Sequence, residues 1–362
     1  MLYHLLYPLR DIFFGFNIFR YITFRAAMAA FTAFICSLIF FPLLIQKLKA
    51  AGIGENIRRE ESADLYNLHQ AKQGTPTMGG LLILAAILVS TFLWADMTNY
   101  FIHVSMFVLV WLGVTGFIDD YIKQRKKQSK GLGIRTKLLS QVILGLIVGI
   151  FLFLSPRSST QLEMPFFKYS NVEFGLFYVL LVIFVICGSS NAVNLTDGLD
   201  GLAIGIVVMV ALSFSVLSYI AGNIKFSQYL FIPYLEGAGE LSIFCASIFG
   251  AGLGFLWFNC YPASIFMGDV GSLSLGGALG TVAVLIKKEF LLVVVGGIFV
   301  VEALSVILQV GSYRMRKKRI FKIAPLHHHL QFIGWPESKV IVRFWIIAAL
   351  LALLTLITLK IR

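Results

Sequence analysis

Charged residues are scarce in this chain of 362 residues: they make up 13% of it, whereas apolar residues make up 58%. A soluble domain of this length would carry nearly twice that share of charge. Several apolar runs reach 18 residues or more, and a helix of that length matches the hydrocarbon thickness of a bilayer. The shortage of charge therefore argues against an ordinary soluble enzyme and predicts an integral membrane protein.

Cysteine is also rare, and its placement argues against a disulfide framework or a cysteine-based metal site. We interpret the four cysteines as small buried apolar residues, because all fall in or beside apolar runs without short spacings: Cys36, Cys187, Cys245 and Cys260.

A cleavable signal peptide is not evident, because charged residues interrupt the first 25 positions at Arg10, Asp11 and Arg20. Residues 1–22 are instead predicted to form an interfacial segment that leads into the first span.

The apolar runs predict an all-α, polytopic membrane helix bundle of about ten transmembrane helices. Helices are expected because each span must satisfy its own backbone hydrogen bonds in lipid. We find no internal repeat and no low-complexity segment, so residues 1–362 are interpreted as one integral-membrane domain. The expected spans are 23–46, 77–95, 99–119, 138–155, 171–190, 200–220, 240–257, 269–286, 289–313 and 341–360.

The basic residues predict the orientation of this bundle. Three segments, 47–76, 120–137 and 314–343, hold 20 of the 30 lysines and arginines, and each follows an odd-numbered span. Cytoplasmic loops carry the excess of positive charge, so ten spans would place both termini in the periplasm. The net charge of +12 is explained by this rule and by anionic phosphates, and we expect no nucleic-acid partner.

Acidic residues are few, and five of them share one predicted membrane edge. The cytoplasmic span ends hold Asp119, Asp120, Asp197, Asp200 and Asp269. This agreement is informative because the orientation used only lysine and arginine. Carboxylates that converge repel one another unless a cation is present. Magnesium fits, because it prefers hard oxygen ligands and accepts phosphate oxygens in its shell.

Each acidic motif also has a purely structural alternative. The pair in FIDDYIK could be a hydrated membrane-edge pair held by Lys123. The motif NAVNLTDGLDGLA could be a polar turn, although it also places Asn194 near Asp197 and Asp200. Asp269 could cap the N-terminus of the eighth span, a role that is compatible with metal binding.

Two further motifs contain polar groups on the same side. HQAKQGTPTMGG, residues 69–80, offers Lys72 and Thr77 beside several glycines, and an ordinary turn is its alternative. KIAPLHHHL holds His327, His328 and His329, of which at most two can face one ligand on a helix. Zinc would favour i, i+4 spacing. We therefore favour hydrogen bonds to phosphate or substrate, with a structural membrane re-entry after the proline as the alternative.

One acidic residue, Glu302, falls in the middle of the ninth expected span, near Gln309. An ionisable residue inside the membrane suggests a functional site. A hydrogen bond that packs two helices together explains it equally well.

Together, KQGTPTMGG, FIDDYIK, NAVNLTDGLDGLA, FMGDVGSL, PLHHH and VIVRFW resemble the polyprenyl-phosphate N-acetylhexosamine-1-phosphate transferases over nearly the whole chain. The PLHHH form resembles the muramoyl-pentapeptide branch more than the UDP-GlcNAc branch. The chain departs from the family after the histidines, where Leu330 and Gln331 replace the usual aromatic residue and glutamate.

The resemblance implies a reaction at the cytoplasmic face of the bacterial inner membrane. UDP-MurNAc-pentapeptide and undecaprenyl phosphate would give lipid I and UMP with Mg2+, in the first membrane step of peptidoglycan synthesis. It implies the lipid bilayer as surroundings and, because members are often dimers, a homodimer as a candidate assembly.

The resemblance also implies roles for individual residues. The acceptor-side pair would be Asp119 and Asp120, and the magnesium ligand Asp269. Nucleotide-site positions would be Lys72, Asn194, Asp197, Asp200, Asn259 and Phe266, with Phe266 stacked on uracil. Further substrate contacts would be Thr77, Lys123, Lys137, Gln309, His327, His328 and His329.

Three other functions are compatible with parts of the pattern. A UDP-GlcNAc:undecaprenyl-phosphate transferase would share most motifs. A magnesium or proton-coupled transporter would use the carboxylates, but it should place ionisable groups near mid-membrane in repeated halves. A nucleotide-binding sensor would need the same pocket without catalysis.

Overall fold

A computed structural model of the chain describes residues 1–54, 72–126, 131–155, 160–163 and 171–360. Four of the basic residues used to predict the orientation, at positions 58, 59, 127 and 130, lie outside these ranges. The N-terminal elements are α1 (Leu2–Leu6), two 3-10 helices, η1 (Tyr7–Asp11) and η2 (Phe14–Arg20), α2 (Ile22–Ala50) and α4 (Gly80–Trp94). The central elements are α5 (Tyr100–Lys126), α6 (Ile134–Leu154), β1 (Gln161–Glu163), β2 (Asn171–Glu173), α7 (Phe177–Thr196), α8 (Leu202–Ala221) and α9 (Ile224–Leu230). The C-terminal elements are α10 (Glu240–Asn259), α11 (Gly268–Leu285), α12 (Glu289–Val295), α13 (Gly297–Arg316), α14 (Leu326–Phe332) and α15 (Glu337–Thr358).

The expected polytopic all-α fold is confirmed. Among the described residues, nine helices are long and apolar enough to cross a membrane, and α4 is a shorter apolar helix of 15 residues. Because α4 covers most of the second expected span, each of the ten expected spans corresponds to an apolar helical segment. The placement of the two termini in the periplasm stays a prediction.

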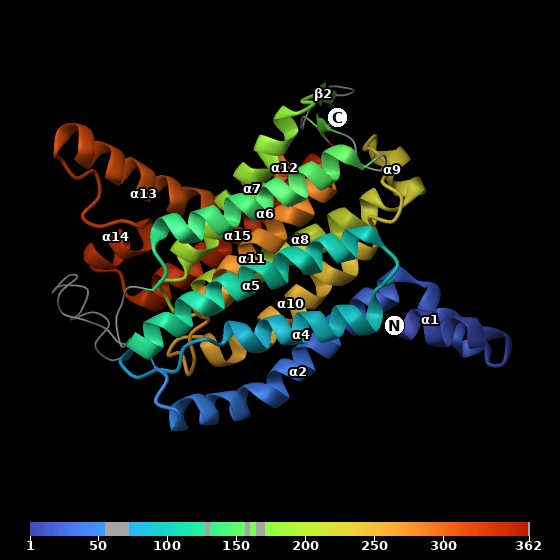
Figure 1. Ribbon diagram of the computed structural model, residues 1–362, viewed down its shortest axis with the longest axis horizontal. Coiled ribbons are helices and arrows are strands. Elements are labelled where there is room, and N and C mark those ends of the chain that lie inside the picture. Colours follow the sequence, from blue (N-terminus) through green and yellow to red (C-terminus); the bar gives the residue numbers. More distant parts are fainter. Residues whose placement is uncertain (55–71, 127–130, 156–159, 164–170, 361–362) are drawn as a thin grey trace.

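The ninth expected span, 289–313, is wrong as a single helix. The chain forms α12, breaks at Gly296 and continues as α13. Two successive glycines, Gly296 and Gly297, lie at the break, where the lack of side chains makes a kink inexpensive. Figure 1 shows α13 leaving the bundle at an angle, with α14 beside it.

The start of the fifth expected span, 171–190, is also wrong. Residues 171–173 form the second strand of a short antiparallel hairpin, in which Leu162 lies opposite Val172. The helix α7 begins only at Phe177, after Gly175 has adopted a left-handed backbone with φ of 50°. It then extends to Thr196, so the whole span is displaced toward the C-terminus.

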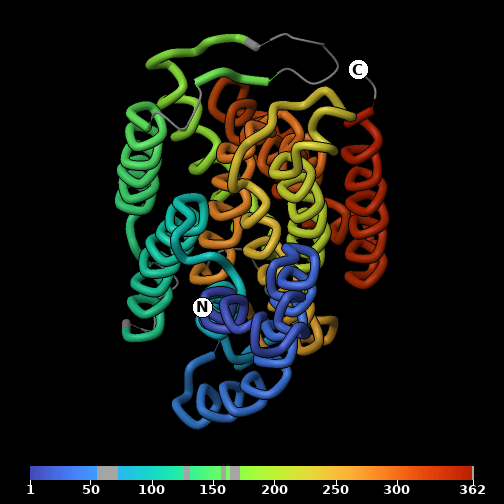
Figure 2. Tube along the Cα trace, turned by 90° about the vertical axis from the view of Figure 1, so that its right-hand side faces the viewer, coloured from blue at the N-terminus to red at the C-terminus, as the bar shows by residue number. Residues whose placement is uncertain are grey.

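The centre of the bundle is α11, whose apolar window is 89% buried. It packs chiefly against α5 and α7, while α10 packs against α2 and α8. Glycines allow these helices to approach closely, as small residues commonly do between membrane helices. A Cβ added to Gly80 of α4 would lie 2.2 Å from the backbone nitrogen of Gly271 in α11. Figure 2 shows the helices stacked around this centre, with α2 and α15 at the outside.

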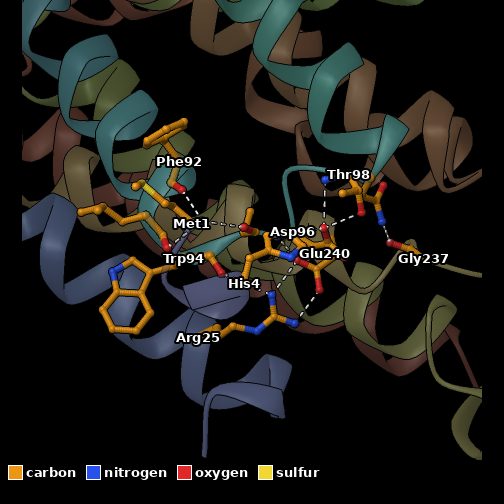
Figure 3. Close-up of polar contacts among 12 residues, drawn as sticks. Met1, His4, Arg25, Phe92, Trp94, Asp96, Thr98, Gly237 and Glu240 are labelled. Carbon is orange, nitrogen blue, oxygen red and sulfur yellow. Dashed lines mark hydrogen bonds and ion pairs between the residues drawn. The ribbon is translucent and has the colours of Figure 1, made fainter. Parts of the chain in front are cut away.

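A polar cluster holds the N-terminal segment against the other end of α4, far along that helix from Gly80. The amine of Met1 donates hydrogen bonds to the carbonyl oxygens of Phe92 and Ala95, at 2.7 and 3.3 Å. Arg25 donates two hydrogen bonds to the carboxylate of Glu240, at 2.9 and 2.6 Å (Figure 3). The interfacial segment expected at residues 1–22 is thus a series of short helical turns anchored to the bundle.

Asp96 completes this cluster. Its carboxylate lies 2.9 Å from His4 and accepts hydrogen bonds from the backbone and hydroxyl of Thr98 (Figure 3). Burial raises the pKa of Asp96, but these hydrogen bonds and the nearby histidine outweigh it and hold the pKa below 3.8. The contact ties the first turn of the chain to the loop after α4.

Candidate functional site

Three aspartates meet where α5 ends and α11 begins. Asp119 and Asp120 lie in the last turns of α5, and Asp269 is the second residue of α11. One ligand oxygen from each lies within 4.8 Å of the others. The convergence expected from the sequence is therefore found for these three. Among the described residues, they are the one group of His, Cys, Asp or Glu side chains close enough to hold a metal ion.

Two lysines contact this aspartate cluster. Nζ of Lys123 lies 2.6 Å from Asp119, 2.8 Å from Asp269 and 3.6 Å from Asp120. Nζ of Lys137, from α6, lies 2.6 Å from Asp269 and 3.1 Å from Asp119. Three carboxylates and two ammonium groups leave one net negative charge, so the cluster can still accept a divalent cation.

Hydrogen bonds orient each aspartate. Asn194 of α7 donates to Oδ1 of Asp269 at 2.7 Å. Backbone N–H groups donate to the other two: Leu132 to Asp119 at 2.6 Å and Val270 to Asp120 at 3.2 Å. These hydrogen bonds hold three carboxylates whose ligand oxygens lie within 4.8 Å of one another.

The N-cap interpretation of Asp269 is wrong. The helix α11 begins at Gly268, its N-cap residue is Met267, and no side-chain cap hydrogen bond is made. Gly268 has φ of 73°, and a Cβ there would lie 2.5 Å from Oδ2 of Asp120. Glycine is thus required for Asp120 and Asp269 to approach each other.

The residues present fit a magnesium ion. Carboxylate oxygens are hard ligands, and magnesium is usually bound by one or two of them together with water and phosphate oxygens. Asp269 is central because both lysines and Asn194 converge on it. Asp119 and Asp120 would supply further oxygen ligands at the same point.

A second polar cluster lies on the loop between α7 and α8. Nζ of Lys72 lies 2.6 Å from Asp200 and 2.5 Å from Glu337, the first residue of α15. The same Glu337 carboxylate accepts a hydrogen bond from the backbone N–H of Asp200 at 3.0 Å. Glu337 was not predicted from the sequence. The signal that could have found it is its position just before the last apolar run, in a segment rich in basic residues.

Backbone and amide hydrogen bonds join the turn before α11 to the loop between α7 and α8 and to the segment before α4. Asn259 accepts from the backbone of Gly201 at 3.0 Å and donates to the carbonyl of Ile265 at 2.8 Å. Phe266 donates its N–H to the carbonyl of Pro76 at 2.7 Å. The buried Thr77 therefore lies in a segment paired with the start of α11, beside the aspartate cluster.

Asp197 ends α7 as its C-cap residue. The turn that follows contains Gly201, whose φ of 77° favours glycine. The segment from Asp197 to Asp200 is therefore a turn, as the structural alternative expected, but it also carries the carboxylate that pairs with Lys72.

The three histidines have different partners, which confirms that at most two face one point. His327 and His328 flank Gly198, where an added Cβ would lie 2.4 and 3.3 Å from their Nε2 atoms. Nδ1 of His329 instead accepts a hydrogen bond from the backbone of Lys322 at 3.1 Å. Gln331, where the chain departs from the family pattern, pairs with Nδ1 of His328 at 3.0 Å.

Both the nitrogen and the oxygen of the Gln309 side-chain amide form hydrogen bonds with the protein backbone. It donates to the carbonyl of Phe321 and accepts from the N–H groups of Ile320 and Phe321, all at 3.0 Å. In this arrangement it braces the segment before the histidines. A direct substrate contact for Gln309 stays a prediction.

Comparisons with known proteins match both the central part of the chain and its full length. A family model described as glycosyl transferase family 4 matches residues 101–287, and the phospho-N-acetylmuramoyl-pentapeptide-transferase signature 1 matches residues 72–84. Two relatives, from Citrifermentans bemidjiense and Geobacter sp. strain M21, are 56% identical over 362 residues and cover 100% of both chains. Both are named phospho-N-acetylmuramoyl-pentapeptide-transferase.

Proposed function

The chain belongs to the phospho-N-acetylmuramoyl-pentapeptide-transferase family, and from this premise we propose its reaction and the residues that perform it. It transfers phospho-N-acetylmuramoyl-pentapeptide from UDP-MurNAc-pentapeptide to undecaprenyl phosphate, which gives lipid I and UMP. The observation that carries the assignment to this site is the meeting of Asp119, Asp120 and Asp269 with two lysines at one end of the bundle.

Two anionic substrates must be held together for this reaction. Phosphoryl transfer depends mainly on positioning and on stabilisation of the charge that spreads over the phosphate oxygens. Lys123 and Lys137 supply positive charge at the aspartate cluster. Asp269, with Asp119 and Asp120 beside it, would hold Mg2+, which supplies further charge stabilisation to the diphosphate.

The bond changes follow from the chemistry of the substrates. An oxygen of undecaprenyl phosphate forms a bond to the β-phosphorus of the donor. The bond between that phosphorus and the bridging oxygen breaks, and UMP leaves with the bridging oxygen. Asp119 takes the proton of the acceptor phosphate when that phosphate is a monoanion.

The nucleotide end of the donor would lie at the second polar cluster. Lys72, Asp200 and Asn259 hold the loop between α7 and α8 against the turn before α11. Phe266 lies on that turn and is only partly buried, which supports a ring that stacks on uracil.

The chain is a multi-pass membrane protein, and the lipid acceptor requires the site to lie at a membrane edge. We place that edge at the cytoplasmic face of the bacterial inner membrane, because the basic residues gather there. A homodimer stays a prediction.

The experiment that tests this function measures UMP release by the purified protein in lipid vesicles. Release should require undecaprenyl phosphate, UDP-MurNAc-pentapeptide and Mg2+, and lipid I should appear in equal amount. UDP-GlcNAc offered in place of the donor should give no lipid product. Turnover of UDP-GlcNAc alone would reassign the chain to the other branch of the family.

A further inference from the structure

Glu302 is a fully buried carboxylate in the second turn of α13, with 0% of its surface exposed. Its partner is the histidine motif. Oε1 accepts a hydrogen bond from the backbone N–H of His327 at 3.1 Å, and Oε2 lies 3.2 Å from Nδ1 of the same residue, at the distance of an ion pair. One intramembrane carboxylate thus contacts both the backbone and the ring of His327.

The ring of His327 is equally buried, and its other nitrogen has no such partner. Nδ1 faces the Glu302 carboxylate at 3.2 Å, and Nε2 lies on the opposite side of the ring. Within the described part of the chain, neither ring nitrogen makes a hydrogen bond, but Nδ1 has a carboxylate, which can accept its hydrogen, within reach. Nε2 points at Gly198, where a Cβ would lie 2.4 Å away. A buried polar atom without a partner calls for an explanation, and a group of a bound ligand is one that would complete its hydrogen bonding.

The contact with Gly198 places Nε2 of His327 close to the residues that are proposed to bind the nucleotide. Gly198 lies in the turn that also carries Asp200, whose carboxylate pairs with Lys72. The absence of a side chain at Gly198 leaves room for the imidazole to approach the backbone of this turn.

We propose that Glu302 is a positioning residue that holds the His327 imidazole so that Nε2 bonds a polar group of the nucleotide-sugar donor. The inference rests on the proposed function, since it names a further residue of the same site. The physical basis is general: the group that contacts one nitrogen of an imidazole sets the orientation and the tautomer of the ring, and thereby what the other nitrogen can bond. Glu302 acts through His327 and does not itself touch the donor.

The test compares variants of Glu302 and His327 in vesicles, with the KM values of donor and acceptor measured separately. In Glu302→Gln, an amide can accept from the backbone N–H but no longer supplies a charged acceptor to Nδ1. We expect the KM for the donor to rise about 10- to 100-fold, the range for a hydrogen bond made with a charged group. The KM for undecaprenyl phosphate should change less than about twofold, because His327 faces the donor side.

A double-mutant cycle separates positioning from a general structural effect. If Glu302 acts through His327, then Glu302→Gln should cause no further loss in a His327→Ala background. Ser305→Ala is the matched control, because Ser305 is buried one turn further along α13 and bonds only the backbone of Glu302. Its kinetics should equal those of the wild type.

A second variant, Gly198→Ala, disturbs the position of the His327 ring from the side opposite Glu302. In Gly198→Ala, the new methyl group would displace the imidazole, so the donor KM should rise while the acceptor KM stays unchanged. Donor binding measured by calorimetry without undecaprenyl phosphate should weaken in parallel in every variant that moves the ring. If Glu302→Gln does not fold, this second route still tests the part of the inference that joins the position of the His327 ring to donor binding.

An unchanged donor KM in folded Glu302→Gln would overturn the inference. So would equal and additive losses from Glu302→Gln in the presence and absence of His327. Either result leaves the proposed function intact, provided that the wild-type protein releases UMP. A wild-type protein that makes no lipid I would instead overturn the proposed function itself.

Discussion

Asp269→Asn is the substitution with the clearest expected effect, because three side chains converge on this carboxylate. Oδ2 lies 2.8 and 2.6 Å from two ammonium groups, and Oδ1 accepts from Asn194 at 2.7 Å. An asparagine keeps the shape but has only one acceptor oxygen. In either orientation of the amide, its NH2 group faces another donor, either the lysines or Asn194.

The size of the loss follows from these contacts. Each ~1.4 kcal/mol of lost transition-state stabilisation lowers the rate about tenfold. The variant would remove a ligand from an ion that contributes several kcal/mol of charge stabilisation in such reactions. Turnover by Asp269→Asn should therefore fall at least about 10³-fold, and the Mg2+ concentration needed for half-maximal residual activity should rise.

The assay is UMP release in vesicles across a magnesium titration, at saturating donor and acceptor. Asp96→Asn is the matched control, because it makes the same chemical change at the opposite end of α4, where Asp96 contacts His4. That control should keep wild-type turnover and magnesium dependence. A loss below tenfold in Asp269→Asn, with an unchanged magnesium titration, would remove Asp269 from the metal site.

Two further predictions test the orientation and the second polar cluster. A reporter fused after residue 362 should be periplasmic and one inserted near residue 127 should be cytoplasmic, because loops rich in basic residues stay on the cytoplasmic side. The opposite result would place the site on the other side of the membrane from its soluble donor. Glu337→Gln should weaken UMP binding about tenfold, as measured by calorimetry, because Lys72 and the backbone of Asp200 share that carboxylate. Unchanged binding would limit Glu337 to a role in folding.

Much of the site could be predicted from sequence because charge asymmetry and span length are local properties. Once the spans and their orientation are set, Asp119, Asp120 and Asp269 must lie at the same membrane edge. Their contact then requires only that α5 and α11 are neighbours, and the glycines that permit this, such as Gly116 and Gly268, are visible in the sequence.

The pairing of Glu302 with His327 could not be predicted in the same way. Glycine is common in membrane helices, so Gly296 and Gly297 alone do not reveal that the ninth span breaks. The break sets the direction of α13, and that direction decides which residue of α14 meets Glu302. Glu337 was missed for a similar reason, because its partners Lys72 and Asp200 belong to distant segments.

Asp119→Asn tests whether this residue is the general base for direct attack by the acceptor. Oδ1 of Asp119 accepts the N–H of Leu132 and Oδ2 lies near two lysines, so the acceptor phosphate would meet the carboxylate and its cations together. General-base assistance typically contributes about 10²–10⁴ in rate. Turnover should fall within that range, while donor binding measured without acceptor stays nearly unchanged.

The pH dependence of this loss distinguishes a base from a positioning group. The second pKa of a phosphate monoester is about 6, so the fraction of acceptor that still carries a proton declines as the pH rises above that value. The defect of Asp119→Asn should therefore shrink at high pH, where no proton remains to be removed. A loss that is the same at every pH would deny Asp119 the role of base and leave it an electrostatic one. A stoichiometric burst of UMP without undecaprenyl phosphate would refute direct attack altogether. Such a burst is expected only from a covalent route, in which an aspartate nucleophile releases UMP before the acceptor binds. The aspartate that best fits that role is Asp269.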